Sequence, residues 1–206
     1  MKKELLSHKN FLIKNYNKKI LNKKKFDIIF DEIDQECDYK KNTYHVLSKK
    51  FNFDFKINEI KKFKRFKNIV IIGMGGSILG TSAIYEFLRH KIKKKVTFFD
   101  NLDKEKLKRF IEKNNIKNCL FIIISKSGNT IETLSNLINF NILKLNAKNI
   151  IIITEKKKNI LNLIAKKYNL FFIEHKNFLG GRYSVLSEVG IVPSYLMGIN
   201  IIKLRC

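Results

Sequence analysis

Residues 69–77 read Ile-Val-Ile-Ile-Gly-Met-Gly-Gly-Ser, a run of four β-branched residues that leads into a glycine-rich segment. A continuous apolar run of this length, bounded by glycine, is typical of a strand buried on both faces of a parallel sheet. The residues that follow, 77–90, have the pattern of a helix. The stretch therefore predicts a strand, a tight loop and a helix, which together begin a βαβ unit.

The same alternation continues along the chain. Further strands are predicted at residues 96–99, 119–124, 149–153 and 170–173. Helices are predicted between them: one ends near residue 114, and two others cover residues 130–145 and 159–168. Strands that alternate with helices of about 10–15 residues indicate right-handed βαβ units. We therefore predict an α/β fold over residues 66–206: a three-layer αβα sandwich with a mostly parallel five-stranded sheet.

The first 65 residues have a different character. They are rich in lysine, and apolar residues recur among them at roughly helical spacing: Leu5, Leu6, Phe11, Leu12 and Ile13. No internal repeat and no chemically suggestive motif is visible there. We expect a helical N-terminal extension over residues 1–65 that packs on the main domain.

Composition limits the classes of function. The net charge of +24 favours a nucleic-acid-binding role, but the basic excess is spread over both parts of the chain rather than gathered in one arm, so no specific nucleic-acid partner is expected. The three cysteines, Cys37, Cys119 and Cys206, contain no CxxC pair and fit reduced thiols better than a disulfide framework or a zinc site. The apolar runs are far shorter than the roughly 18 residues that span a bilayer. We expect a cytoplasmic protein without a membrane partner.

The first candidate site is the loop at residues 73–80, directly after the first predicted strand. Its glycines, Gly76 among them, let the backbone approach a ligand. The start of the following helix offers backbone N–H groups, and Ser77 adds a hydroxyl. The loop is not the dinucleotide-binding pattern, because that pattern needs a glycine where Ile78 stands. A tight turn without any ligand is the alternative.

The second candidate site follows the third predicted strand and reads Ser-Lys-Ser-Gly-Asn-Thr over residues 125–130. Hydroxyls from Ser125, Ser127 and Thr130, with backbone donors at a helix start, can surround a phosphate, and Lys126 adds a positive charge. Thr130 is also a plausible helix N-cap. Capping explains only part of this string, so phosphate binding is the favoured interpretation.

The third candidate site is the segment Gly-Gly-Arg-Tyr-Ser-Val-Leu-Ser at residues 180–187. An arginine that follows two glycines suggests a guanidinium on the buried side, held against a negatively charged or oxyanionic group. Arg182 is therefore a candidate for charge stabilisation in a reaction. A structural salt bridge is the alternative.

In this order, the motifs GGS-x-LG, SKSGNT-x-ET and GGRYSVLS-x-VG resemble those of the glucose-6-phosphate isomerase family, most closely its bacterial branch. The first two motifs alone would fit any sugar-phosphate-binding domain of the SIS type. The resemblance implies a homodimeric enzyme without metal or cofactor that interconverts glucose 6-phosphate and fructose 6-phosphate through a cis-enediolate. It implies that Ser125, Lys126, Ser127 and Thr130 hold the phosphate, that Gly76 and Ser77 line the sugar, and that Arg182 stabilises the enediolate.

The sequence departs from this family in one important respect. The family's glutamate base, ring-opening histidine and late lysine lie downstream of the third motif, and they have no counterpart here. We therefore expect a truncated chain that binds sugar phosphate weakly and isomerises little or nothing. His175 is expected to be a loop or surface residue and Glu188 a solvated helix residue, neither of them catalytic.

Three other functions stay open at this point. A non-catalytic SIS module that senses a sugar phosphate would need only the first two loops. A related aldose–ketose isomerase that also accepts mannose 6-phosphate would share all three. A basic nucleic-acid-binding protein would bind with steep salt dependence and without competition from sugar phosphates.

Overall fold

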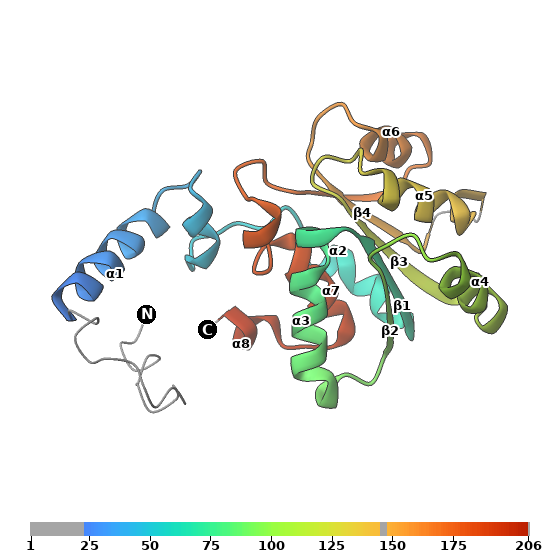
Figure 1. The fold of residues 1–206 in the computed structure, drawn as a ribbon, viewed down its shortest axis with the longest axis horizontal. Coiled ribbons are helices and arrows are strands. Elements are labelled where there is room, and N and C mark those ends of the chain that lie inside the picture. The colour runs from blue at the N-terminus through green and yellow to red at the C-terminus, as the bar shows by residue number, and fades with distance from the viewer. Residues whose placement is uncertain (1–22, 145–147, 206) are drawn as a thin grey trace.

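The computed structural model describes residues 23–144 and 148–205. Its five strands form one sheet in the order β2-β1-β3-β4-β5, and each neighbouring pair is parallel (Figure 1). The strands are β1 (Asn68–Gly73), β2 (Lys95–Phe99), β3 (Cys119–Ile124), β4 (Ile150–Thr154) and β5 (Phe171–Glu174). The predicted α/β fold and its five-stranded sheet are confirmed.

Helices connect and flank these strands. They are α1 (Lys23–Cys37), α2 (Ile57–Lys61), α3 (Leu79–Leu88), α4 (Lys104–Lys113), α5 (Ile131–Asn139), α6 (Ile160–Lys167), α7 (Glu188–Met197) and α8 (Ile201–Arg205). The helix predicted over 130–145 is too long, because α5 ends at Asn139. Asn141 adopts a φ of 53°, a left-handed conformation that stops a helix, and a short 3-10 turn over 142–144 follows.

The sheet is buried on both faces, which explains its unbroken apolar strands. Alternate residues of β1 point to opposite sides: Ile69 and Ile71 belong to one core cluster, and Val70 and Ile72 to the other. The first cluster is completed by residues of α2 and α7, with α3 against it, and the second by residues of α4, α5 and α6. Figure 1 shows these two sets of helices on either side of the sheet, which is the predicted three-layer arrangement.

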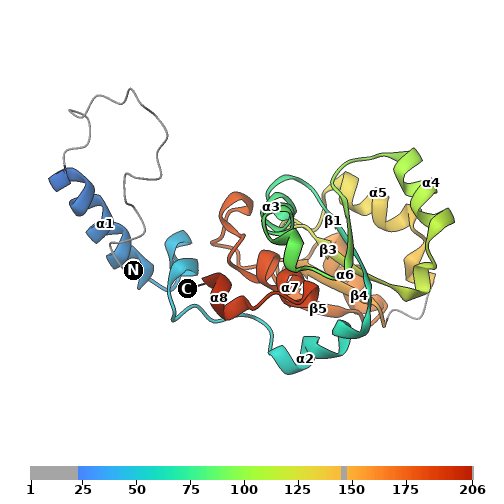
Figure 2. The same cartoon turned by 90° about the horizontal axis from the view of Figure 1, so that it is seen from below.

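The N-terminal segment is partly separate from the sheet and partly built into its core. In both views α1 projects away from the sheet (Figures 1 and 2). By contrast, Ile60 and Phe63 are buried in the same cluster as β1. The five apolar residues on which the helical pattern of the extension was based lie outside the described residues, and the division of the chain at residue 65 stays a prediction.

A small third cluster joins the N-terminal segment to the loop after β5. Val46 and Phe51 pack there against Leu179. Arg205, on α8, donates hydrogen bonds to the carbonyl oxygens of Val46 (2.9 Å) and Leu186 (2.6 Å), so it ties three distant segments together. None of the described helices is long and apolar enough to cross a membrane.

Candidate functional site

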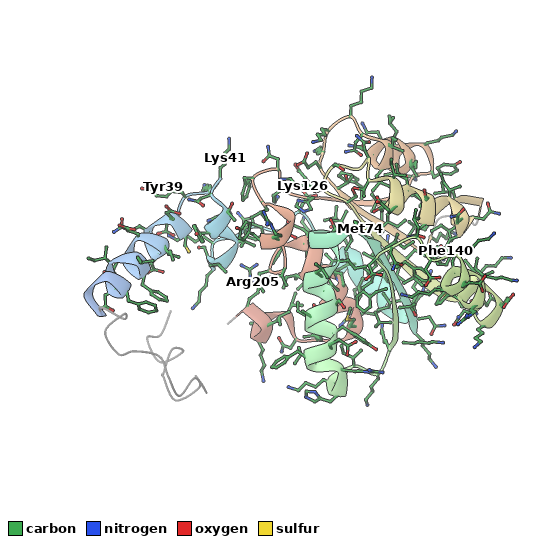
Figure 3. All side chains as sticks on the ribbon, in the orientation of Figure 1. Tyr39, Lys41, Met74, Lys126, Phe140 and Arg205 are labelled. Carbon is green, nitrogen blue, oxygen red and sulfur yellow. The ribbon has the colours of Figure 1, made fainter. Side chains whose placement is uncertain are left out.

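An open cleft of about 510 Å³ lies at the carboxyl edge of the sheet. The loops after β1 and β3 both contribute to it, and these two strands flank the point where the strand order reverses, which is where ligands bind in open α/β sheets. The lining residues are Met74, Gly76, Ser77, Lys126, Ser127, Thr130, Glu155, Lys157 and Gly181. The cleft therefore gathers residues from all three predicted loops, and Met74 and Lys126 are labelled in Figure 3.

The hydroxyls of the second loop form a compact cluster. Ser125 Oγ lies 2.9 Å from Thr130 Oγ1, and Ser127 Oγ lies 3.3 Å from the same atom. Ser125 Oγ also accepts a hydrogen bond of 3.1 Å from the Gly128 N–H. The sequence places the three hydroxyls together because the chain turns sharply between the end of β3 and the start of α5.

Thr130 stands at the N-cap position of α5, as predicted, but it does not act as a side-chain cap. Within the described residues its hydroxyl receives no hydrogen bond from the first turn of α5 and contacts Ser125 and Ser127 instead. The first-turn N–H groups of α5 thus have no side-chain acceptor from Thr130. Three hydroxyls beside a helix N-terminus form an arrangement that can donate several hydrogen bonds to an anion.

The Lys126 side chain turns toward the segments that follow β4 and β5. Its Nζ donates a hydrogen bond of 2.8 Å to the carbonyl oxygen of Asn177 and lies 3.7 Å from Glu155 Oε1. The second carboxylate oxygen of Glu155 pairs with Lys157. Two ammonium groups and one carboxylate therefore face the cleft, which gives this side a net positive charge.

The segment after β4 is a wall of the cleft that sequence reasoning missed. Glu155 N donates to the carbonyl oxygen of Lys126 (3.2 Å), and Leu161 N donates to that of Gly128 (3.1 Å), so this segment is fastened to the second loop. One signal could have found it. β4 ends in the same parallel sheet, so the Glu-Lys-Lys-Lys that follows Thr154 had to emerge at the same edge as the other loops.

The third loop packs closely on the first, through its backbone at Gly76 and through the Val185 side chain at Gly80. A Cβ on Gly76 would overlap the carbonyl carbon of Gly181 and would lie 2.7 Å from Arg182 N. Arg182 itself is exposed, so the expectation of a guanidinium on the buried side is wrong. It forms no ion pair with any described residue, which also removes the structural salt bridge as its explanation. Arg182 is exposed because it lies in a short surface turn, Gly181–Tyr183, in which Gly181 faces the first loop.

His175 and Glu188 are both buried, which corrects the expectation that they face solvent. His175 is 1% exposed because it directly follows β5, and its Nδ1 lies 3.0 Å from the carbonyl oxygen of Lys176. Glu188 is fully buried under the third loop, where its Oε1 accepts a hydrogen bond of 2.9 Å from Asp54 N. Burial lowers the pKa of His175 and raises the pKa of Glu188. Neither belongs to the described cleft lining.

A parallel sheet with a glycine-rich loop after β1 and a hydroxyl-rich loop after β3 defines an α/β protein of the SIS type. Solved structures agree on the fold: a hypothetical protein of Thermus thermophilus superposes with a TM-score of 0.72 at 22% identity, covering 88% of this chain and 47% of that one. A glucose-6-phosphate isomerase of Chlamydia trachomatis superposes with a TM-score of 0.61 at 24% identity, covering 72% and 29%.

The chain belongs to the phosphoglucose isomerase family, whose pattern matches residues 22–204. It is 38% identical over 156 residues to the glucose-6-phosphate isomerase of Methanocaldococcus jannaschii, covering 74% of this chain and 38% of that protein. It is 38% identical over 141 residues to that of Borreliella afzelii, covering 63% and 26%. The chain thus spans well under half the length of these relatives.

Proposed function

We propose that the cleft binds the phosphate group of a sugar phosphate, and that this is the substrate-binding part of a glucose-6-phosphate isomerase. The observation that carries the proposal is the hydroxyl of Thr130, which stands at a helix N-cap without capping and joins Ser125 and Ser127 at 2.9 and 3.3 Å. Each hydroxyl has one proton to donate, so the three can turn from one another toward a single acceptor group beside the helix start. A phosphate offers acceptor oxygens to all of them at once.

The remaining lining residues are assigned to the sugar. Gly76 and Ser77 also line the cleft, together with Gly181, whose backbone packs against Gly76. Arg182 follows Gly181 directly and is free to turn toward a ligand, because its side chain is exposed. We assign it the cationic role beside an enediolate, where a positive charge stabilises the developing negative charge.

The proton transfer between C1 and C2 requires a base, and the described cleft does not offer a free one. Its lining contains a single carboxylate, Glu155, which is held by Lys126 and Lys157. Glu188 is buried elsewhere and bound to Asp54 N. We therefore propose that the residues described here bind the substrate, and that turnover depends on groups that they do not supply.

The test compares two threonine-to-valine variants of the same helix. Thr130→Val removes the hydroxyl of the cluster, and we expect it to weaken binding of fructose 6-phosphate by about 10- to 100-fold in calorimetric titration, the value of a hydrogen bond to a charged group. Thr133→Val is the matched control, because the Thr133 hydroxyl is buried without a partner among the described residues. Equal affinities of the two variants would refute the phosphate assignment.

A coupled isomerase assay on the same preparation separates binding from turnover. Binding of fructose 6-phosphate without turnover is the expected result. Turnover by the chain would mean that a base exists within these residues and would refute the assignment of these residues to binding alone. Mannose 6-phosphate in the same titration tests sugar selectivity, and inorganic phosphate measures the share of affinity that comes from the phosphate.

A further inference from the structure

Glu155 is a carboxylate in a cleft to which we have assigned an anionic ligand. It directly follows β4, and only 9% of its side chain is exposed. Each of its two oxygens faces a different ammonium group: Oε1 lies 3.7 Å from Lys126 Nζ, and Oε2 pairs with Lys157 Nζ. All three side chains line the cleft.

The backbone fixes this carboxylate in place relative to the second loop. Glu155 N donates to the carbonyl oxygen of Lys126, and the Glu155 carbonyl oxygen accepts a hydrogen bond of 3.1 Å from Asn159 Nδ2. Asn159 is in turn the N-cap of α6, so Glu155 is joined to a rigid element. The backbone that carries this side chain is therefore fixed relative to the second loop and to α6, and the ion pairs with Lys126 and Lys157 hold the carboxylate itself.

The charges of these three residues determine what the cleft attracts. Two lysines and one glutamate leave a net charge of +1, whereas the lysines alone would present +2. A phosphate that enters the cleft is repelled by Glu155 and attracted by the same ammonium groups that Glu155 already holds. Charges within one cleft interact strongly because the protein around them screens less than water does.

We propose that Glu155 is an internal counter-anion, which competes with the ligand phosphate for Lys126 and Lys157 and so limits how tightly the cleft binds anions. The proposal rests on the assignment of the cleft to a sugar phosphate and adds a residue that sets its affinity. When the ligand is absent, Glu155 holds the two ammonium groups. When the ligand binds, Lys126 exchanges one anionic partner for another.

The competing interpretation is that Glu155 serves binding by holding the lysines in position. The two interpretations predict opposite signs for the same substitution. Glu155→Gln keeps the size and one carbonyl oxygen of the side chain but removes its charge. If Glu155 competes with the ligand, the variant binds anions more tightly; if Glu155 only positions the lysines, it binds them less tightly.

The experiment is a calorimetric titration of the whole chain with inorganic phosphate and with fructose 6-phosphate at low salt. We expect Glu155→Gln to bind both about tenfold more tightly, which corresponds to about 1.4 kcal/mol. The double variant Glu155→Gln/Lys157→Gln restores the net charge of the cleft and should return to near the affinity of the unaltered chain. Added salt should shrink the difference.

Glu112→Gln is the control for a change in overall charge, because Glu112 is exposed near the end of α4. It should leave both affinities unchanged. If the unaltered chain binds the ligands and Glu155→Gln binds them equally or more weakly, the counter-anion role of Glu155 is refuted, and the assignment of the cleft to sugar phosphate stands. If neither the unaltered chain nor Glu155→Gln binds either ligand, the assignment of the cleft to sugar phosphate fails as well.

Discussion

Replacement of Gly76 by alanine tests whether the first and third loops must touch for the cleft to exist. A Cβ at this position would lie 2.7 Å from both Arg182 N and Gly181 O, whereas ordinary contact begins at 3.4 Å, so the loops must separate by about 0.7 Å or more. Backbone atoms on the far side cannot rotate away as a side chain would. Overpacking of this kind costs about 1–3 kcal/mol in the free energy of unfolding.

The same separation should spoil ligand binding, because Gly76 and Gly181 both line the cleft. A displacement approaching 1 Å can reduce function by roughly 100-fold. We expect the dissociation constant for fructose 6-phosphate to rise about tenfold or more in calorimetric titration. Chemical denaturation followed by circular dichroism measures the loss of stability.

Gly180→Ala is the matched control in the neighbouring segment. A Cβ there would meet only the ring of Tyr183, at 3.2 Å, and that side chain is exposed and able to move. Its φ of −65° is open to any residue. We expect changes within about 0.5 kcal/mol, as at ordinary surface positions. If Gly76→Ala matches the control in both its stability and its dissociation constant for fructose 6-phosphate, the close contact between the loops is not required and the reasoning is wrong.

Three further substitutions test polar groups that lie outside the cleft lining. Burial lowers the pKa of His175 from its usual 6.5, so the folded protein should lose stability as the pH falls below that value, and thermal melts of His175→Gln should show a smaller loss. Burial raises the pKa of Glu188 from its usual 4.5, so the folded state loses stability as the pH rises past that value. Glu188→Gln should therefore gain stability relative to the unaltered chain as the pH rises above 4.5. Arg205→Lys should lose about 1–3 kcal/mol of stability and expose the segment near Val46 to limited proteolysis, because a lysine cannot reach the carbonyl oxygens of both Val46 and Leu186.

The three central strands, β1, β3 and β4, could be predicted from the sequence because they are buried on both faces. Residues 69–72 and 119–124 carry no solvent-facing position, so their apolar runs are unbroken and their ends are marked by glycine or serine. The chemistry of the second loop could be predicted for a related reason. Parallel strands end at one edge of the sheet, so polar residues after them must meet there.

The environment of individual side chains could not be predicted in the same way. His175 follows β5 and Glu188 begins α7, and nothing local in the sequence tells that distant segments bury them, as Asp54 does at Glu188. The exposure of Arg182 depends on the turn that carries it. The homodimer and the cytoplasmic location follow only from the family resemblance and from composition, and they stay predictions.

A glycine in these motifs can be required by ligand binding or by close backbone packing, and the sequence alone cannot separate the two. Gly76 belongs to a motif that looks built for a ligand, yet its lack of a side chain is already required by the backbone of Gly181. Gly190 behaves likewise, since a Cβ there would overlap the carbonyl oxygen of Val185 within the third motif. The first and third motifs are therefore coupled by packing, and one cannot change without the other. The hydroxyls of the second motif contact one another and N–H groups of their own turn, and the phosphate that we propose would give them a shared acceptor.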